Sequence, residues 1–165
     1  MAYGCSYPNG HVIKRALLYK CPPTINHKIK DGKTALALAS YYGQAKAVGY
    51  ILQRHPIIDQ AGPDGLTAFG HALAGLTRST RPTDYTPHYA ETILRLLKAG
   101  ADPRCPLPSD LLQTVGIGNA INVVIYATRP DRLSMVDGRR LVEKLVQKGV
   151  TLDVCARDWL LSTRG

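Results

Sequence analysis

The feature that most constrains the fold of this chain is a nine-residue segment that occurs twice. The segment DGKTALALA begins at Asp31, and the similar segment DGLTAFGHA begins at Asp64, 33 residues later. Each copy opens with Asp-Gly, a turn dipeptide, and continues with a threonine that can cap the helix beginning after it. Self-similarity at a fixed period of about 20 to 50 residues is typical of chains built from stacked repeats. We therefore expect a repeat architecture.

The segments that follow the turns have helical patterns. Residues 31–52 predict two short helices broken at Gly43. In residues 90–100, AETILRLLKAG, four apolar side chains form one stripe of a helix. These are Ile93, Leu94, Leu96 and Leu97. Gly100 follows as a helix stop that tolerates a positive φ, and Gly149 holds the same place in residues 139–153. An unrelated helical bundle is the alternative, but it does not explain the 33-residue echo.

These segments together resemble the ankyrin-repeat family. T-A-L at Thr34 and T-A-F at Thr67 stand where the ankyrin signature has T-P-L, and 33 residues is the ankyrin period. Residues 91–103, ETILRLLKAGADP, are similar to the second helix of that repeat and its G-A-D turn. The resemblance covers Asp31 to Asp102. It implies an all-α solenoid of about three to four helix-turn-helix repeats with irregular insertions.

The resemblance divides this single array into five parts. Residues 1–30 form an N-terminal capping repeat, and residues 31–63 form a full repeat. Residues 64–103 form a repeat with an insertion at 76–87, and residues 104–153 form a divergent repeat with a long finger and an insertion, in which Asn119 takes the place of Thr67. Residues 154–165 begin an incomplete C-terminal cap, where Trp159 could shield the exposed end or mark where a longer natural chain was cut.

Composition and charge limit the classes of function. The chain has 165 residues, 45% of them apolar and 20% charged, as in an ordinary globular protein. No apolar run approaches the roughly 20 residues of a membrane span, and the N-terminus lacks the pattern of a secretory signal, so we expect a cytoplasmic protein, in its producer or in a recipient cell. The net charge of +9 favours acidic partners.

The cysteines and the other motifs do not predict a catalytic or metal site. The cysteines are widely spaced, so we expect reduced thiols and neither a disulfide framework nor zinc. They are Cys5, Cys21, Cys105 and Cys155. There is no P-loop, and GIGNAI at residues 116–121 lacks the third glycine of a dinucleotide turn. His71 is expected to serve hydrogen bonding in the repeat. We expect no catalysis, no metal and no cofactor.

A binding face is expected where the family resemblance implies one, on the concave surface made by the fingertips and the first helices. Tyr41 and Tyr42 end a first helix, where the next repeat has Ala74 and Gly75, so packing does not demand bulk there. Tyrosine is enriched at interfaces. The whole expected face consists of Lys28, Lys30, Asp31, Lys33, Tyr41, Tyr42 and Tyr126. The alternative is that a tyrosine packs on a neighbouring helix and the lysines are merely solvated.

The insertion in the second repeat is a candidate for a second contact surface, because functional residues concentrate on loops. Its candidate contact residues are Arg78, Arg81, Tyr85, His88 and Tyr89. The alternative is a solvated loop.

The expected function is therefore a non-catalytic protein-interaction module. It would bind one specific protein with an acidic surface, as a monomeric adaptor or inhibitor such as an effector or immunity-type protein. One alternative is electrostatic association with nucleic acid, which a continuous basic stripe would favour. Its members would be Arg78, Arg81, Arg129, Arg132, Arg139 and Arg140. The other alternative is a regulatory fragment of a larger enzyme.

Overall fold

The structure is a computed structural model that describes residues 25–28, 31–78, 88–107, 109, 119–128 and 133–163. In these ranges the chain forms seven named helices and no strand, which confirms the expected all-α class for them. The helices are α2 (Ala35–Tyr41), α3 (Ala45–Leu52), α4 (Ala68–Arg78), α5 (Tyr89–Ala99), α7 (Ala120–Ala127), α8 (Met135–Gln147) and α9 (Val154–Ser162).

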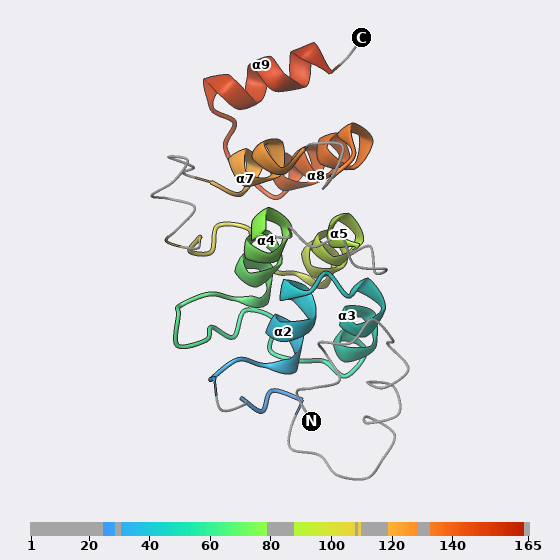
Figure 1. Ribbon diagram of the computed structural model, residues 1–165, viewed down its shortest axis with the longest axis vertical. Coiled ribbons are helices and arrows are strands. Elements are labelled where there is room, and N and C mark those ends of the chain that lie inside the picture. The colour runs from blue at the N-terminus through green and yellow to red at the C-terminus, as the bar shows by residue number, and fades with distance from the viewer. Residues whose placement is uncertain are drawn as a thin grey trace.

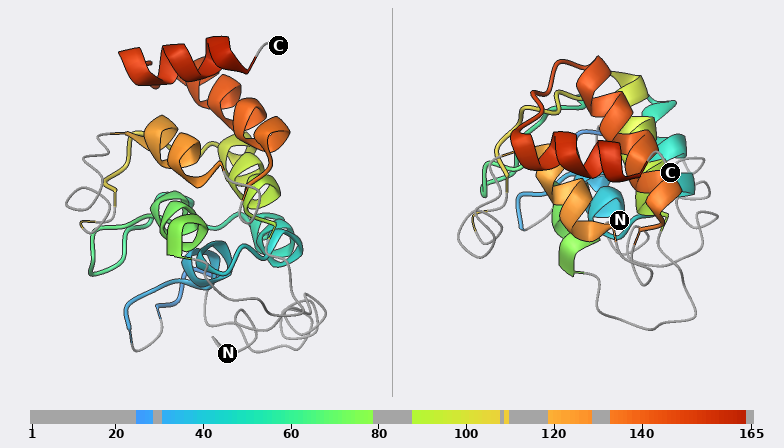
Figure 2. Two further views of the ribbon diagram at one scale, coloured as in Figure 1. Left: turned by 45° about the horizontal axis from the view of Figure 1, so that its top comes forward. Right: turned by 90° about the horizontal axis from the view of Figure 1, so that it is seen from above.

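The helices stack as pairs in chain order (Figure 1). The pairs α2–α3, α4–α5 and α7–α8 form successive layers, and α9 lies on the last of them. Within the stack, α2, α4, α7 and α9 form one column in which each helix contacts the next, while α3, α5 and α8 form the second column. Figure 2 shows the same two columns from a tilted viewpoint.

Each helix of the first column begins with a side-chain cap. The Thr34 hydroxyl accepts from the Ala37 N–H at 3.1 Å, and the Thr67 hydroxyl accepts from the Gly70 N–H at 3.4 Å. These two bonds confirm the predicted caps. Asn119 caps α7 and Asp153 caps α9 through the same type of bond, at 3.1 Å and 2.8 Å respectively. Because a cap satisfies backbone donors that the helix cannot, four cap residues at equivalent points fix where the four helices start.

The stop signals of the second column also act as predicted. Gly100 adopts φ 105° directly after α5, and Gly149 adopts φ 86° two residues after α8 ends. Only glycine takes this left-handed conformation at little cost. The chain therefore leaves both helices in the same way and returns to the first column.

One hydrophobic core runs through the stack between the two columns. The predicted stripe of α5 belongs to it: Ile93, Leu96 and Leu97 are fully buried, and Leu94 packs partly against it. Helix α4 lies between α2 and α7, and ten of its eleven residues are buried. The middle of the stack is thus the most deeply packed part of the described chain.

Two expected boundaries differ from the structure. Helix α4 continues through Arg78, so residues 76–78 are not part of an insertion, because Leu76 and Thr77 still lie on the buried surface of this helix. Helix α8 begins at Met135, earlier than the segment starting at Arg139 that resembles the family's second helix, because Ser134 caps it by accepting from the Asp137 N–H. Trp159 packs partly against the core. The expected capping repeat falls almost wholly outside the described residues, as do most of the long finger and of the insertion between α4 and α5.

Candidate functional site

The candidate site lies where the C-terminal end of α2 meets α4. Tyr41 is the last residue of α2, and its carbonyl oxygen accepts a hydrogen bond from the Tyr89 hydroxyl at 3.0 Å. A Cβ added to Gly75 of α4 would overlap that same carbonyl oxygen. The sequence suggested only that bulk is not needed at Gly75. The structure shows that a side chain is excluded there, because the two helices approach each other through backbone.

Two aromatic rings form the exposed part of the site. The Tyr41 and Tyr42 ring centroids are 5.2 Å apart with an interplanar angle of 86°, an edge-to-face arrangement that aromatic pairs favour. Tyr42 is 40% exposed, whereas Tyr41 is half-buried. The Lys33 ammonium lies 6.0 Å from the centroid of the Tyr41 ring, within the range of a cation–π contact. This pair and Lys33 were predicted to share a face, and the structure brings them together.

His71 of α4 lies beneath this face, and sequence reasoning did not place it there. Its ring centroid is 6.4 Å from that of Tyr41, and its side chain is 3% exposed. The His71 Nε2 lies 3.5 Å from Asp64 Oδ2 but has no hydrogen-bond partner among the described residues. Burial lowers the pKa of His71; the Asp64 carboxylate opposes that shift, and the positive charges of Lys33 and Arg78 add to it. The imidazole is therefore neutral at pH 7.

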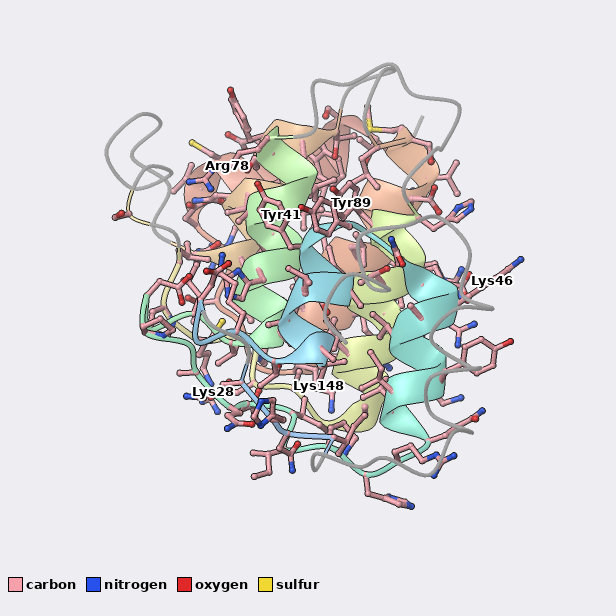
Figure 3. All side chains as sticks on the ribbon, turned by 60° about the horizontal axis from the view of Figure 1, so that its bottom comes forward. Lys28, Tyr41, Lys46, Arg78, Tyr89 and Lys148 are labelled. Carbon is pink, nitrogen blue, oxygen red and sulfur yellow. The ribbon has the colours of Figure 1, made fainter. Side chains whose placement is uncertain are left out.

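Arg78 belongs to the same face, although the sequence suggested a separate loop. It ends α4 seven residues after His71, close to two helical turns, so both lie on one side of the helix. Figure 3 shows Arg78 and Tyr41 at the same end of the α2–α4 pair. Lys28 lies at the opposite end of α2. Arg78 is exposed, and its charge acts on His71.

Other predicted contact residues lie apart from this face. The Lys28 ammonium donates to the Ala61 carbonyl at 2.9 Å and so joins the segment before α2 to the loop between α3 and α4. Asp31 is exposed in the turn before α2, and Lys30 lies outside the described residues. Tyr126 is half-buried on α7 and packs against the core, with α4 between it and α2.

The predicted second surface is corrected at two of its residues. Tyr89 is only 6% exposed and packs in the core, because it opens α5 and its hydroxyl reaches the end of α2. Arg78 is helical and lies at the first face. His88 is exposed, and its backbone N–H donates to the Gly43 carbonyl at 3.0 Å. Arg81 and Tyr85 lie outside the described residues.

A signal for the missed residues exists in the sequence. His71 and Arg78 are seven residues apart in one helical segment, a spacing that puts both on one helix face. Asp64 opens the second turn, and its Oδ1 accepts from the Leu66 N–H at 3.2 Å. Nothing in the sequence shows that its Oδ2 faces His71, because that contact depends on how the turn folds over α4.

The described residues contain no assembled metal site. No group of three or more His, Cys, Asp or Glu side chains among them could hold a metal ion. Cys105 and Cys155 are free cysteines. Burial raises the pKa of the Cys105 thiol, so it stays protonated and is a weak nucleophile. Among the helices of the described chain, none is long and apolar enough to cross a bilayer.

Several arginines of the described surface are already paired with acids. Arg95 contacts Glu91 at 2.7 Å, Arg104 contacts Asp102 at 3.2 Å, and Arg139 contacts Glu143 at 3.2 Å. Arg139 also donates to the Thr163 carbonyl at 3.1 Å. Arg139 belongs to the basic stripe that would favour nucleic acid, but in the structure its side chain is bonded to groups of the protein itself. Three other members, Arg81, Arg129 and Arg132, lie outside the described residues.

Comparison with known proteins gives a likeness of fold. No protein-family model and no curated protein matches the chain. Among solved structures, a chain from the complex of the Bd0816 predatory endopeptidase of Bdellovibrio bacteriovorus with immunity protein Bd3460 is similar to it. The TM-score is 0.52 at 17% identity, over 98% of this chain and 90% of that one. At this identity the likeness concerns the fold, and it extends over nearly the whole length of both chains.

Proposed function

We propose that this protein is a non-catalytic binding module, an ankyrin-type solenoid that binds one protein with an acidic surface and acts as an inhibitor of immunity type. The observation that carries the proposal is the aromatic and cationic face formed by Lys33, just before α2, and by Tyr41 and Tyr42 at the end of α2. A rigid aromatic pair beside a flexible cation is a composition that protein interfaces favour.

The repeat architecture supports the ankyrin part of the proposal. Capped first helices start at Ala35, Ala68, Ala120 and Val154, and each contacts the next in the column. The first two are separated by the 33-residue period of the family resemblance. An array of this kind offers a partner an extended binding surface without exposing its hydrophobic core.

The structural likeness supports the inhibitor part. The solved complex to which the similar chain belongs pairs an endopeptidase with an immunity protein. For this chain we propose a role of the same class as that of the immunity protein: it binds a partner protein in a stoichiometric complex. Fold likeness alone does not identify that partner. We further propose that the protein acts as a monomer in the cytoplasm.

Nucleic acid is the second candidate, because the net charge of +9 favours any polyanion. The paired arginines Arg95, Arg104 and Arg139 weigh against it, since their acidic partners lower the positive potential of those surfaces.

An affinity experiment separates the two candidates. The tagged full chain is incubated with lysate of its source cells at two salt concentrations, with and without nuclease, and bound proteins are identified and quantified by mass spectrometry. A single acidic protein retained at a one-to-one ratio after nuclease and high salt supports the proposal. The complex is then purified, its mass is measured by light scattering, and the partner's enzymatic activity is assayed with and without the chain.

A matched pair of variants controls for charge. Lys33→Glu changes the proposed face, whereas Lys46→Glu makes the same charge change at an exposed residue of α3, well away from Tyr41 in Figure 3. The first should lose the partner and the second should retain it. Recovery that disappears with nuclease, or that both variants lose equally, would refute the protein-binding face.

A further inference from the structure

Helix α9 closes the C-terminal end of the stack, and no other named helix lies over its outer side in the view from above (Figure 2). Elsewhere in the first column each helix is covered by the next one: α4 packs on α2, α7 on α4 and α9 on α7. The outer side of α9 thus has the place that a following helix covers in α2, α4 and α7. Its shape suits a further helix.

The outer side of α9 combines apolar and charged side chains. Ala156 is the buried residue of this helix, and at 3.6 residues per turn four side chains lie opposite it. They are Val154, Arg157, Asp158 and Leu161. Val154 is 72% exposed and Leu161 is 64% exposed. Two large apolar side chains this open to water on one side of a short helix indicate an interaction surface.

The adjoining surface of α8 is also apolar. Met135 and Val146 are exposed and lie at helical spacing on the same side of α8 as Arg139. The Arg139 side chain donates to the carbonyl of Thr163, the C-cap of α9, at 3.1 Å. This side of α8 therefore faces the end of the stack beside α9. The exposed apolar side chains of the two helices border one another there.

The outer side of α9 is complementary to itself. Along the helix its four side chains run apolar, cationic, anionic, apolar. An antiparallel copy with a two-fold axis between positions 157 and 158 places Val154 against Leu161 of the second copy and Arg157 against Asp158 of the second copy. Each contact then occurs twice, as in every two-fold interface. Neither Arg157 nor Asp158 forms an ion pair inside the described part of the chain, so both charges are open to this contact.

We propose that two copies of this chain pair end to end through the outer side of α9, antiparallel about that two-fold axis. The pairing does not depend on the proposed function. The face of Lys33, Tyr41 and Tyr42 belongs to the first layer, and α9 lies beyond the last, so the single chain remains the unit that binds the partner protein.

The pairing is weak, because the contact is small. A helix of nine residues is about 14 Å long, which gives much less than the roughly 800 Å² that each partner buries in a standard interface. We expect a Kd on the order of 100 µM, so that the dilute protein is a monomer. The net charge of +9 on each copy also opposes association, but at 0.15 M salt the Debye length of about 8 Å screens all but the nearest charges.

Sedimentation of the full chain tests the pairing, at protein concentrations from about 5 to 500 µM in 0.15 M salt with reductant present. We expect the measured mass to rise from monomer to dimer. Leu161→Glu should weaken the dimer at least roughly tenfold, because it puts a carboxylate against Val154 of the second copy. Ile57→Glu makes the same change at a side chain that is 59% exposed between α3 and α4, and it should pair as the wild type does.

Charge variants test the register. Arg157→Asp and Asp158→Arg each set like charges against one another across the axis and should weaken the dimer by roughly fivefold. The double variant restores opposite charges at the unchanged net charge, so its dimer should be within about twofold of the wild type. Arg157→Asp is the more decisive single change, since it lowers the net charge and would strengthen a non-specific association. Circular dichroism of each variant shows whether its helices are intact.

Four outcomes would overturn the pairing. The first is a monomer at every concentration, and the second is a dimer that Leu161→Glu leaves intact. The third is a double charge variant no better than the single ones. The fourth is a chain that stays monomeric alone but loses its captured partner in Leu161→Glu, which would assign this side of α9 to a helix of the partner protein. Capture of the partner by the Lys33 face is measured separately, so either proposal can fail without the other.

Discussion

At the scale of single residues, the approach of two backbones sets the position of the tyrosine pair. Gly75 lets α4 touch the carbonyl of Tyr41, and the Tyr89 hydroxyl donates to that carbonyl while the Tyr89 ring lies beside Gly75. Gly49 is also a helical glycine, but a Cβ there would meet only the flexible guanidinium end of Arg95. A close backbone contact therefore requires glycine at position 75, whereas no such contact requires it at position 49.

These two glycines give a matched prediction. Gly75→Ala should destabilise the protein by about 1–3 kcal/mol, because the new methyl group forces two backbones apart. Gly49→Ala should be neutral or stabilising by up to about 1 kcal/mol, since Ala is the better helix former and Arg95 can move aside. Urea unfolding of both variants and the wild type measures the difference. Equal effects would mean that the α2–α4 contact is not close.

His71 makes stability depend on pH. Its pKa is lower in the folded protein than the unperturbed value of 6.5, chiefly through burial, so the unfolded chain binds the proton more readily. The contribution of His71 is therefore fully present above about pH 6.5 and declines as the pH falls below that value. The slope from one such group is at most about 1.4 kcal/mol per pH unit.

The measurement for His71 is the free energy of unfolding between pH 5 and 8, compared with His71→Leu. The variant should lack this part of the slope, whatever the carboxylates contribute, because Leu does not titrate. Parallel curves for the two proteins would show that His71 has the same pKa folded and unfolded. His27→Leu is the control, since His27 is exposed.

At the scale of elements, α9 is the most weakly held of the described helices. Only Ala156 of this helix is buried, and the helix packs mainly on α7, while Arg139 of α8 donates to the carbonyl of its C-cap Thr163. Asp153 joins them: Oδ1 caps α9 at the Ala156 N–H, and Oδ2 accepts from the Asn122 amide of α7 at 2.6 Å. The Asp153 carboxylate thus caps the first turn of α9 and also bonds this helix to α7.

We therefore predict that Asp153→Ala loosens α9 alone. Amide hydrogen exchange in α9 should speed up markedly, while exchange in α4 and α5 stays as in the wild type. Asp158→Ala, on an exposed position of the same helix, should change neither. The hydrogen bonds from Asn122 and Ala156 lower the pKa of Asp153, so the docking should also weaken as the pH falls through the carboxylate range. Faster exchange throughout the chain would instead show that α9 supports the whole stack.

Local signals predicted much of the element order and little of the site. The caps Thr34 and Thr67 and the stop at Gly100 follow from chemistry within a few residues, and all three are confirmed. The end of α4 is not a local property, because Leu76 and Thr77 stay helical through contacts that the fold provides. For the same reason the sequence pattern alone places Arg78 in the loop that follows.

The positions of the site residues depend even more on contacts between distant parts of the chain. Tyr89 looks like a loop tyrosine in sequence, and only the stacking of α5 beside α2 reveals that it is buried. The contact between Tyr41 and His71 joins α2 to α4 across 30 residues of chain, which no short-range pattern reports.

At the scale of the whole molecule, charge and contact chemistry make separate contributions to binding. The net charge of +9 acts at a distance and raises the rate at which an acidic partner arrives. The tyrosine pair and Lys33 act only at contact, so they set how long the partner stays. At low ionic strength, where the Debye length is about 30 Å at 0.01 M, a charge reversal away from the face also alters the first quantity, whereas the second responds only at the proposed face.

The two lysines used above test this separation. Lys33→Glu and Lys46→Glu change the net charge equally, so at low salt both should slow association with the captured partner by a factor of a few, Lys33→Glu the more because it lies at the proposed face. That effect should fade toward physiological ionic strength and above, where the Debye length is about 8 Å or shorter. Only Lys33→Glu should speed dissociation, by roughly tenfold, because it alone removes a contact and adds a like charge beside the partner's carboxylate. Surface plasmon resonance across a salt series measures both rates. If both variants speed dissociation equally, the partner reads the overall charge and the α2–α4 face has no special part in binding; if neither does, the partner binds elsewhere on the stack.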